Sequence, residues 1–300
     1  MKRLIYQVCL GQAQNSKLYK KCIESVAKYC EFHGIDHKVQ TQPILMIKPD
    51  IFVTNRSKES YEKHGGFLPI YEKENAFGYF TQGYDQIAII DADIYIRDKA
   101  PNIFDDLGEN YDFGAVVERD MPITGEYAMK IKNYSHMQYS TLKDVQWEWN
   151  DWGAKFYNMG MMVMNKSILE YLHGESARQF LTRPEFKRFV DGDGAWKWST
   201  DQTLLNWWVK KAGVKVKDMS WTWNALYKGV KDEHIPQANF VHFFLKDKLP
   251  QQGENVTKLM EDIGGIWEPE KTFYPHSKVR GNDDSQESPT RTLSGGGNSQ

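Results

Sequence analysis

The stretch from Ile87 to Ile96 constrains the fold of this chain more than any other. Four apolar residues run into Asp91, a single alanine follows, and Asp93 is then succeeded by further apolar residues. An apolar run of this length after turn-forming residues predicts a buried strand of a parallel sheet. Residues i and i+2 of an extended chain share one face, so we expect the two carboxylates side by side, about 7 Å apart at the backbone. They need a positive charge between them, and a divalent cation shared with a substrate phosphate would supply it.

The N-terminal residues predict the opening of a Rossmann-like fold. Residues 4–10 have the composition of a strand, 17–32 carry apolar residues at helical spacing, and 35–40 resemble a second strand. Gly34 is suited to end the helix. In a strand–helix–strand unit of this kind, ligands bind beyond the carboxyl ends of the strands.

The same reasoning extends along the chain. Periodicity and turn residues predict helices over 67–82 and 199–212, and strands over 112–117, 157–165 and 214–217.

Residues 118–154 show little periodicity and contain Trp147, Trp149 and Trp152. Long irregular segments in compact domains are often binding loops. We therefore expect a site for a sugar acceptor in this segment.

Composition restricts the compartment and the partners. The net charge of −2 gives no argument for binding nucleic acid or an anionic membrane. Cys9, Cys22 and Cys30 are odd in number and form no C-x-x-C pair, which is typical of reduced thiols in a cytoplasmic protein. The sequence contains no apolar stretch near the ~20 residues that span a bilayer.

Four segments together resemble nucleotide-sugar glycosyltransferases of the GT-A fold, and among them glycosyltransferase family 8, the family of glycogenin and bacterial galactosyltransferases. In chain order they are Asp91-Ala92-Asp93, the segment from Tyr157 to Asn165, the segment from Asp201 to Asn206, and the segment from Val241 to Pro250. They match the family patterns D-x-D, F-N-x-G-V-x-V-x-N, D-Q-x-x-L-N and V-H-F-x-G-x-x-K-P-W. The last segment departs from its pattern, because Leu245 replaces the glycine and Pro250 comes one residue late with no tryptophan after it.

The resemblance implies an α/β architecture of the GT-A type, a Rossmann-like nucleotide-diphospho-sugar transferase with a mixed, mainly parallel sheet flanked by helices. We expect this domain to span residues 1–270. Residues 271–300 are rich in Ser, Gly and Asn, which predicts a disordered tail. The implied activity is that of a metal-dependent hexosyltransferase that uses a UDP-sugar and an unidentified glycan, lipid or protein acceptor.

The resemblance also implies roles for individual residues. Asp91, Asp93 and His242 would bind Mn²⁺ or Mg²⁺, a set of two carboxylates and one imidazole that suits Mn²⁺. Asn158 and Asp201 would contact the donor sugar.

Gln202 would lie beside the anomeric carbon. Lys248 matches the spacing of the family's diphosphate-binding lysine, and Lys246 is the alternative. Family members retain the anomeric configuration of the sugar. If this chain does the same, Gln202 is a positioning group. For an inverting reaction, Asp201 would be the candidate general base.

Two further residues are candidates from their positions alone. Tyr19 follows the first loop and could stack on the nucleotide base, or simply pack. Lys73, on the helix that leads into the Asp91 strand, could reach a donor phosphate, or remain solvated.

Two other functions stay open. A sugar-phosphate nucleotidyltransferase shares the fold type but should carry a basic, glycine-rich loop after its first strand, whereas residues 10–14 contain one glycine and no Lys or Arg. A non-catalytic carbohydrate-binding protein could use the tryptophan clusters, because aromatic rings stack on sugar faces. That function does not explain why Asp91, Asp93 and His242 occur together.

Overall fold

Six strands form the central sheet of the computed structural model, which describes residues 1–198 and 201–264. Their spatial order is β2 (Asp36–Gln40), β1 (Arg3–Val8), β3 (Gln86–Ile90), β8 (Tyr157–Asn165), β5 (Phe113–Val117) and β9 (Val216–Met219). Strand β8 runs antiparallel to both β3 and β5, and the other neighbours pair in parallel. The prediction of a mixed, mainly parallel sheet is therefore confirmed. The predicted tail over 271–300 lies outside the described residues.

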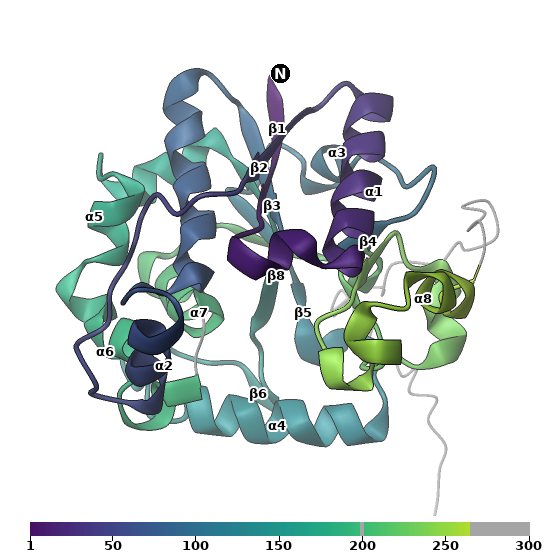
Figure 1. Ribbon diagram of the computed structural model, residues 1–300. Helices are drawn as coiled ribbons and strands as arrows, with labels where there is room; N and C mark the ends of the chain where they lie inside the picture. Colours follow the sequence, from purple (N-terminus) through teal and green to yellow (C-terminus); the bar gives the residue numbers. More distant parts are fainter. Residues whose placement is uncertain (199–200, 265–300) are drawn as a thin grey trace, which may run out of the picture. The chain divides into compact units, whose positions relative to one another are not determined.

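Helices cover both faces of this sheet (Figure 1). On one face lie α1 (Lys17–His33) and α3 (Ile103–Leu107), and on the other lie η2 (Pro69–Gln82), α5 (Ala177–Leu181) and α7 (Asp201–Ala212). Leu18, Cys22 and Val26 share the buried face of α1, and Gly34 ends the helix with a φ of 64°. The helices predicted over 17–32 and 67–82 are thus confirmed, although the second has 3₁₀ geometry. The three cysteines are free and buried.

A second, three-stranded sheet corrects the prediction of one strand from Ile87 to Ile96. The chain leaves the central sheet at Ile90, and β4 (Ile94–Ile96) joins β11 (Phe240–His242) and β10 (Ala225–Leu226). Between the strands Asp91 and Asp93 lie in a turn, closed by the hydrogen bond that the Ile94 N–H donates to the Asp91 carbonyl at 3.1 Å. The residues of β3 and those of β4 are both apolar because both strands are buried, so the apolar pattern could not reveal the turn between them.

The prediction of an irregular segment over 118–154 is wrong for its first half. Residues Gly125–Tyr139 form helix α4, whose N-cap Thr124 accepts a hydrogen bond from the Tyr127 N–H. Ser135 and Gln138 belong to its buried face, and these polar residues conceal the helical period. A short hairpin follows, made of β6 (Trp149–Asn150) and β7 (Gly153–Ala154).

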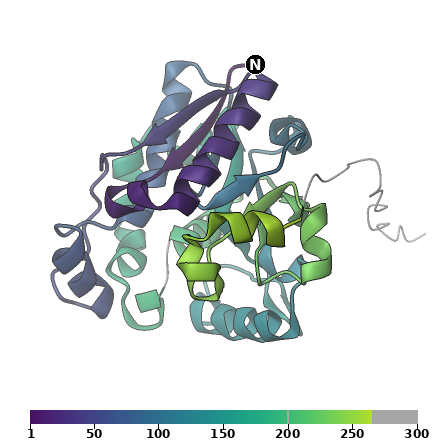
Figure 2. The same ribbon diagram turned by 45° about the vertical axis from the view of Figure 1, so that its right-hand side comes forward.

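The C-terminal end of the described chain lies against α1, where helix α8 (Val256–Asp262) comes forward in Figure 2. The buried guanidinium of Arg97, just after β4, donates to the carbonyls of Ile235, Ile263 and Gly264 at 2.6–2.9 Å.

No helix among the described residues has the length and apolar character needed to cross a membrane. The remaining helical elements are α2 (Asn55–Lys63), α6 (Lys187–Asp191), η1 (Gly11–Asn15), η3 (Glu118–Asp120), η4 (Lys166–Leu172), η5 (Pro184–Phe186), η6 (Gly194–Trp198), η7 (Trp221–Trp223), η8 (Asp232–Gln237), η9 (Lys246–Lys248) and η10 (Pro250–Gly253).

Candidate active site

A cavity of about 1450 Å³ opens at the edge of the central sheet where β1 and β3 end and antiparallel β8 begins. Its wall includes the residues that directly follow β1 and β3, together with Asn158 and Gly160 near the start of β8. Helix α4 contributes Lys130, Ile131 and Tyr134 to the opposite wall. Ligand pockets for drug-sized molecules usually measure 300–1,000 Å³. This cavity is therefore large enough for two substrates.

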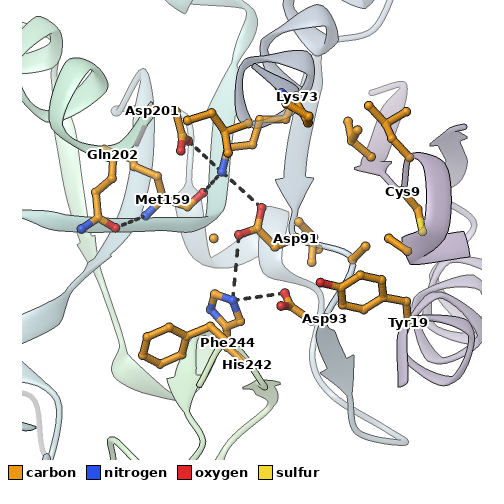
Figure 3. A pocket seen from close by; sticks show the side chains of 18 of the residues that line it. Cys9, Tyr19, Lys73, Asp91, Asp93, Met159, Asp201, Gln202, His242 and Phe244 are labelled. Atoms are coloured by element: carbon orange, nitrogen blue, oxygen red, sulfur yellow. Dashed lines mark hydrogen bonds and ion pairs between the residues drawn. The ribbon is translucent and has the colours of Figure 1, made fainter. Parts of the chain in front are cut away.

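Three potential metal ligands converge in this cavity (Figure 3). Asp91 and Asp93 come from the turn between β3 and β4, and His242 is the last residue of β11. The antiparallel pairing of β4 with β11 sets His242 opposite Ile94, next to Asp93. The His242 Nε2 lies 3.3 Å from Asp93 Oδ1 and 3.9 Å from Asp91 Oδ2. One ligand atom from each residue lies within 4.8 Å of the others, so a single ion could contact all three.

The hydrogen bonds behind His242 determine which ring nitrogen carries the proton. The Gly160 N–H, which can only donate, donates to Asn158 Oδ1 at 3.0 Å. The same oxygen accepts from Asn224 Nδ2 at 2.8 Å, so the Asn224 carbonyl oxygen must be the atom that faces His242 Nδ1 at 3.0 Å. Nδ1 is therefore the donor, and in the neutral ring Nε2 presents its lone pair to the two carboxylates.

A cation would stabilise this arrangement, because otherwise three electron-rich atoms would face one another where His242 is buried and the two carboxylates are partly buried. A proton on Nε2 supplies one: burial alone would lower the pKa of His242, but the charges of Asp93 and Asp91 outweigh burial and raise it. A divalent ion fits as well. A metal-binding histidine usually has its other ring N–H held by a fixed acceptor, which is the role Asn224 has here.

Lys73 lies at the centre of the site rather than in solvent. It extends from η2, and its Nζ lies 2.8 Å from Asp201 Oδ2, 3.2 Å from Asp91 Oδ1 and 2.8 Å from the Met159 carbonyl oxygen (Figure 3). Burial would lower the pKa of Lys73, but the carboxylates of Asp201 and Asp91 outweigh it and raise the pKa. Lys73 thus ties the first residue of α7 to the possible metal site.

Asn158 and Gln202 line the same cavity. The side-chain oxygen of Gln202 accepts from the Met159 N–H at 3.3 Å. Asn158 donates to the carboxylate of Glu118 at 3.2 Å, and Tyr127 donates to the other oxygen of that carboxylate at 2.5 Å.

Glu118 is a site residue that sequence reasoning missed. It is 5 % exposed and borders the cavity. Burial raises its pKa, against the effect of the hydrogen bonds from Tyr127 and Asn158. The signal was present, since Glu118 directly follows an apolar strand, as Asp91 does.

The structure separates the two candidate phosphate lysines. The Lys246 ammonium contacts the Tyr19 hydroxyl and lies 4.3 Å from the centroid of the Tyr19 ring, which lines the cavity. Burial would raise the pKa of Asp93, but the positive charges of His242 and Lys246 hold it below its usual value. Lys248, in contrast, pairs with Glu126 at 2.8 Å. Neither lysine lines the cavity itself, so what distinguishes Lys246 is its contact with Tyr19, which does.

Neither a protein-family model nor a curated protein sequence matches this chain. Among solved structures, a glycosyltransferase involved in the glycosylation of the major capsid of PBCV-1 aligns with 87 % of this chain and 100 % of its own, at 11 % identity and a TM-score of 0.46. Mouse xyloside xylosyltransferase 1 aligns with 83 % of this chain and 100 % of its own, at 14 % identity and a TM-score of 0.44. The galactosyltransferase LgtC, in complex with donor and acceptor sugar analogues, aligns with 91 % and 98 %, at 14 % identity and a TM-score of 0.45. At this level of similarity, the activity has to be inferred from the site itself.

Proposed function

We propose that this chain is a metal-dependent glycosyltransferase that moves a sugar from a UDP-sugar to an acceptor. The observation that carries the proposal is the convergence of Asp91, Asp93 and His242, with the Nε2 lone pair of His242 aimed at the two carboxylates. These three residues would hold Mn²⁺ or Mg²⁺. Such an ion, when bound, stabilises as a Lewis acid the negative charge that develops on the leaving diphosphate.

The remaining residues divide between the nucleotide and the sugar. Lys246 is the phosphate ligand of the proposal, because it contacts Tyr19 at the cavity wall and its charge acts on Asp93, whereas Lys248 is paired with Glu126. Tyr19 offers its ring to the base from the same side. Lys73 holds Asp201 in place and presents its positive charge to the donor.

Asn158, Asp201 and Gln202 would bind the hydroxyl groups of the donor sugar, since the two amides provide donors and acceptors and the carboxylate provides acceptors. We assign a retaining course to the reaction. Asp201 is 4 % exposed and ion-paired with Lys73, so its carboxylate is poorly available as a base for an acceptor hydroxyl. Gln202 is then a positioning group beside the anomeric carbon.

The test is calorimetry of UDP binding, with Mn²⁺ and with EDTA, on the wild type, on Asp93→Ala and on Asp98→Ala. Asp98 is exposed and lies five residues further along the chain, which makes it a matched control. We expect binding that requires Mn²⁺, is lost in Asp93→Ala and is unchanged in Asp98→Ala.

Titrations with GDP and CDP test the choice of base. If UDP, GDP and CDP all fail to bind in the presence of Mn²⁺ or Mg²⁺, or if Asp93→Ala binds as the wild type does, the proposal is wrong. The stereochemical course is then tested by hydrolysis of UDP-sugars, in which the anomeric configuration of the released sugar is measured.

A further inference from the structure

Two half-exposed tryptophans lie outside the cavity, on the hairpin of β6 and β7. Trp149 is 41 % exposed and Trp152 is 50 % exposed. Trp147, in the same segment, is 7 % exposed, and its indole N–H donates to the Leu142 carbonyl at 3.2 Å. The chain thus buries one tryptophan of the segment in the core and leaves two at the surface, and tryptophan is enriched at binding interfaces.

The hairpin that carries the two rings is held firmly against α4. The Ala154 N–H donates to Ser135 Oγ at 3.1 Å, and a Cβ on Gly153 would lie 2.1 Å from that same oxygen. The guanidinium of Arg119 donates to the carbonyls of Glu148 and Gly153. The exposure of the tryptophans is therefore not due to a loose loop.

The turn between β6 and β7 and the ring of Trp149 are also held by specific contacts. The Trp152 N–H donates to Asn150 Oδ1 at 2.8 Å within the turn. One face of the Trp149 indole stacks on the His136 imidazole, with ring centroids 4.7 Å apart and planes inclined by 27°. A ring fixed in this way loses little conformational entropy when a ligand stacks on its exposed face.

We propose that Trp149 and Trp152, supported by His136, form a platform that binds a saccharide chain. A pyranose ring presents an apolar C–H face that stacks on an indole and a rim of hydroxyls that needs polar partners. Asn150 and Asp151 are exposed next to the two tryptophans in the chain and provide such partners.

Other occupants fit this surface less well. Two tryptophans cover far less than the roughly 800 Å² that each partner buries in a stable protein interface. Asp151 lies with Trp152 in the turn between β6 and β7, and its negative charge opposes insertion into an anionic membrane.

Helix α4 connects the platform with the active-site cavity. Lys130, Ile131 and Tyr134 face the cavity, whereas Ser135 and His136 face the hairpin. At 3.6 residues per turn, Ile131 and His136 point about 140° apart around a helix that is about 10–12 Å thick. A saccharide of a few units can pass around the helix, so the platform would hold the far part of a long acceptor whose end is in the cavity. This placement of the acceptor rests on the proposed function, whereas the binding of saccharide to the platform does not.

The experiment is native affinity electrophoresis through gels that contain glycogen, yeast mannan, xylan or a β-1,3-glucan. The proteins are the wild type, Trp149→Ala/Trp152→Ala, Trp149→Tyr, Asp93→Ala and Trp221→Ala, a partly buried tryptophan of η7 that serves as control. We expect at least one gel to retard the wild type, Asp93→Ala and Trp221→Ala equally. The double variant should bind at least 10-fold more weakly, and Trp149→Tyr should retain part of the affinity because it keeps an aromatic face.

Unchanged UDP binding and an unchanged melting temperature would show that the double variant is folded. The proposal is overturned if none of the four gels retards the wild type, or if the double variant is retarded to the same extent. It is also overturned if both tryptophans are instead needed for a dimer in sedimentation velocity, or for binding to phosphatidylglycerol vesicles. The electrophoresis uses neither nucleotide nor metal, so failure of the platform and failure of the proposed donor site give different results.

Discussion

The Nδ1 of His242 and the side-chain oxygen of Asn224 lie 3.0 Å apart, and Asn224 has no exposed surface. Asn224 is in turn fixed by Asn158, whose oxygen also accepts from the Gly160 N–H. The Gly160 backbone N–H, which can only donate, therefore determines through two asparagines that Nδ1 of His242 carries the proton, so that Nε2 presents its lone pair to Asp91 and Asp93.

The variant Asn224→Ala should bind Mn²⁺ about 10–100-fold more weakly, the usual cost of removing a group that orients a metal ligand. Without Asn224 the imidazole can place its proton on Nε2 and turn away from the carboxylates. Calorimetric titration with Mn²⁺ measures the effect. The matched control is Asn239→Ala, because Asn239 is also buried but its amide is directed at Thr222. Equal affinity in both variants would contradict the role given to Asn224.

A second prediction concerns Gly160, which packs against the His242 ring. A Cβ at this position would lie 2.3 Å from His242 Cε1 and 2.8 Å from Nδ1, and the buried ring has little room to move. We expect Gly160→Ala to abolish Mn²⁺-dependent UDP binding and to lower the free energy of unfolding by about 1–3 kcal/mol. Gly78→Ala is the control, since a Cβ there would meet no atom within 4 Å beyond the adjacent helix backbone. Normal UDP binding by Gly160→Ala would show that the His242 ring can shift away from a Cβ at residue 160 without loss of the binding site.

The sequence alone predicts which residues meet in the cavity better than it predicts how they meet. Asp91, Asp93 and His242 come together as expected, but through a turn and a second sheet rather than along one strand. Strand pairing between β4 and β11 joins segments almost 150 residues apart, and no local pattern encodes such a contact.

Lys73 shows the same limit at a single residue. Its helix was predicted, but its burial depends on Asp201 and Asp91 reaching it from two other elements. Helix α4 was missed because Ser135 and Gln138 interrupt its apolar face and are buried through hydrogen bonds instead. Polar residues that are buried with partners are the ones that periodicity alone misassigns.

The ion pair of Lys73 leads to a third prediction, on stability. Lys73→Met leaves the buried carboxylate of Asp201 and the partly exposed carboxylate of Asp91 without their cation, so the free energy of unfolding should fall by about 3 kcal/mol. Adding Asp201→Asn should recover part of this loss, because one of the two charges is then removed. Urea unfolding of the two single variants and the double variant measures the coupling. The control is Lys63→Met, in an exposed pair with Glu59, which should cost less than about 1 kcal/mol. Strictly additive effects of Lys73→Met and Asp201→Asn would show that the pair does not act as a unit.

The last prediction concerns the dependence of stability on pH, at Asp112. Its carboxylate accepts hydrogen bonds from Ser167 Oγ at 2.5 Å and from the Tyr171 hydroxyl at 2.8 Å. Burial would raise the pKa of Asp112, but these hydrogen bonds outweigh burial and hold the pKa below its usual value.

A carboxyl group whose pKa is lower in the folded state stabilises the protein above its unfolded pKa of about 3.9, and this contribution is lost as the pH falls through the folded pKa. Asp112→Asn should therefore lower the free energy of unfolding by about 2 kcal/mol at pH 7, since hydrogen bonds to a charged group are lost and an amide nitrogen would face a donor. The difference from the wild type should stay constant from pH 7 to about pH 5 and narrow only below about pH 4. Urea unfolding at a series of pH values measures it, with the exposed Asp98→Asn as control, for which a change below about 0.5 kcal/mol is expected. A difference that is the same at pH 7 and at pH 3.5 would mean that Asp112 contributes through its shape and neutral hydrogen bonds, and not through its charge.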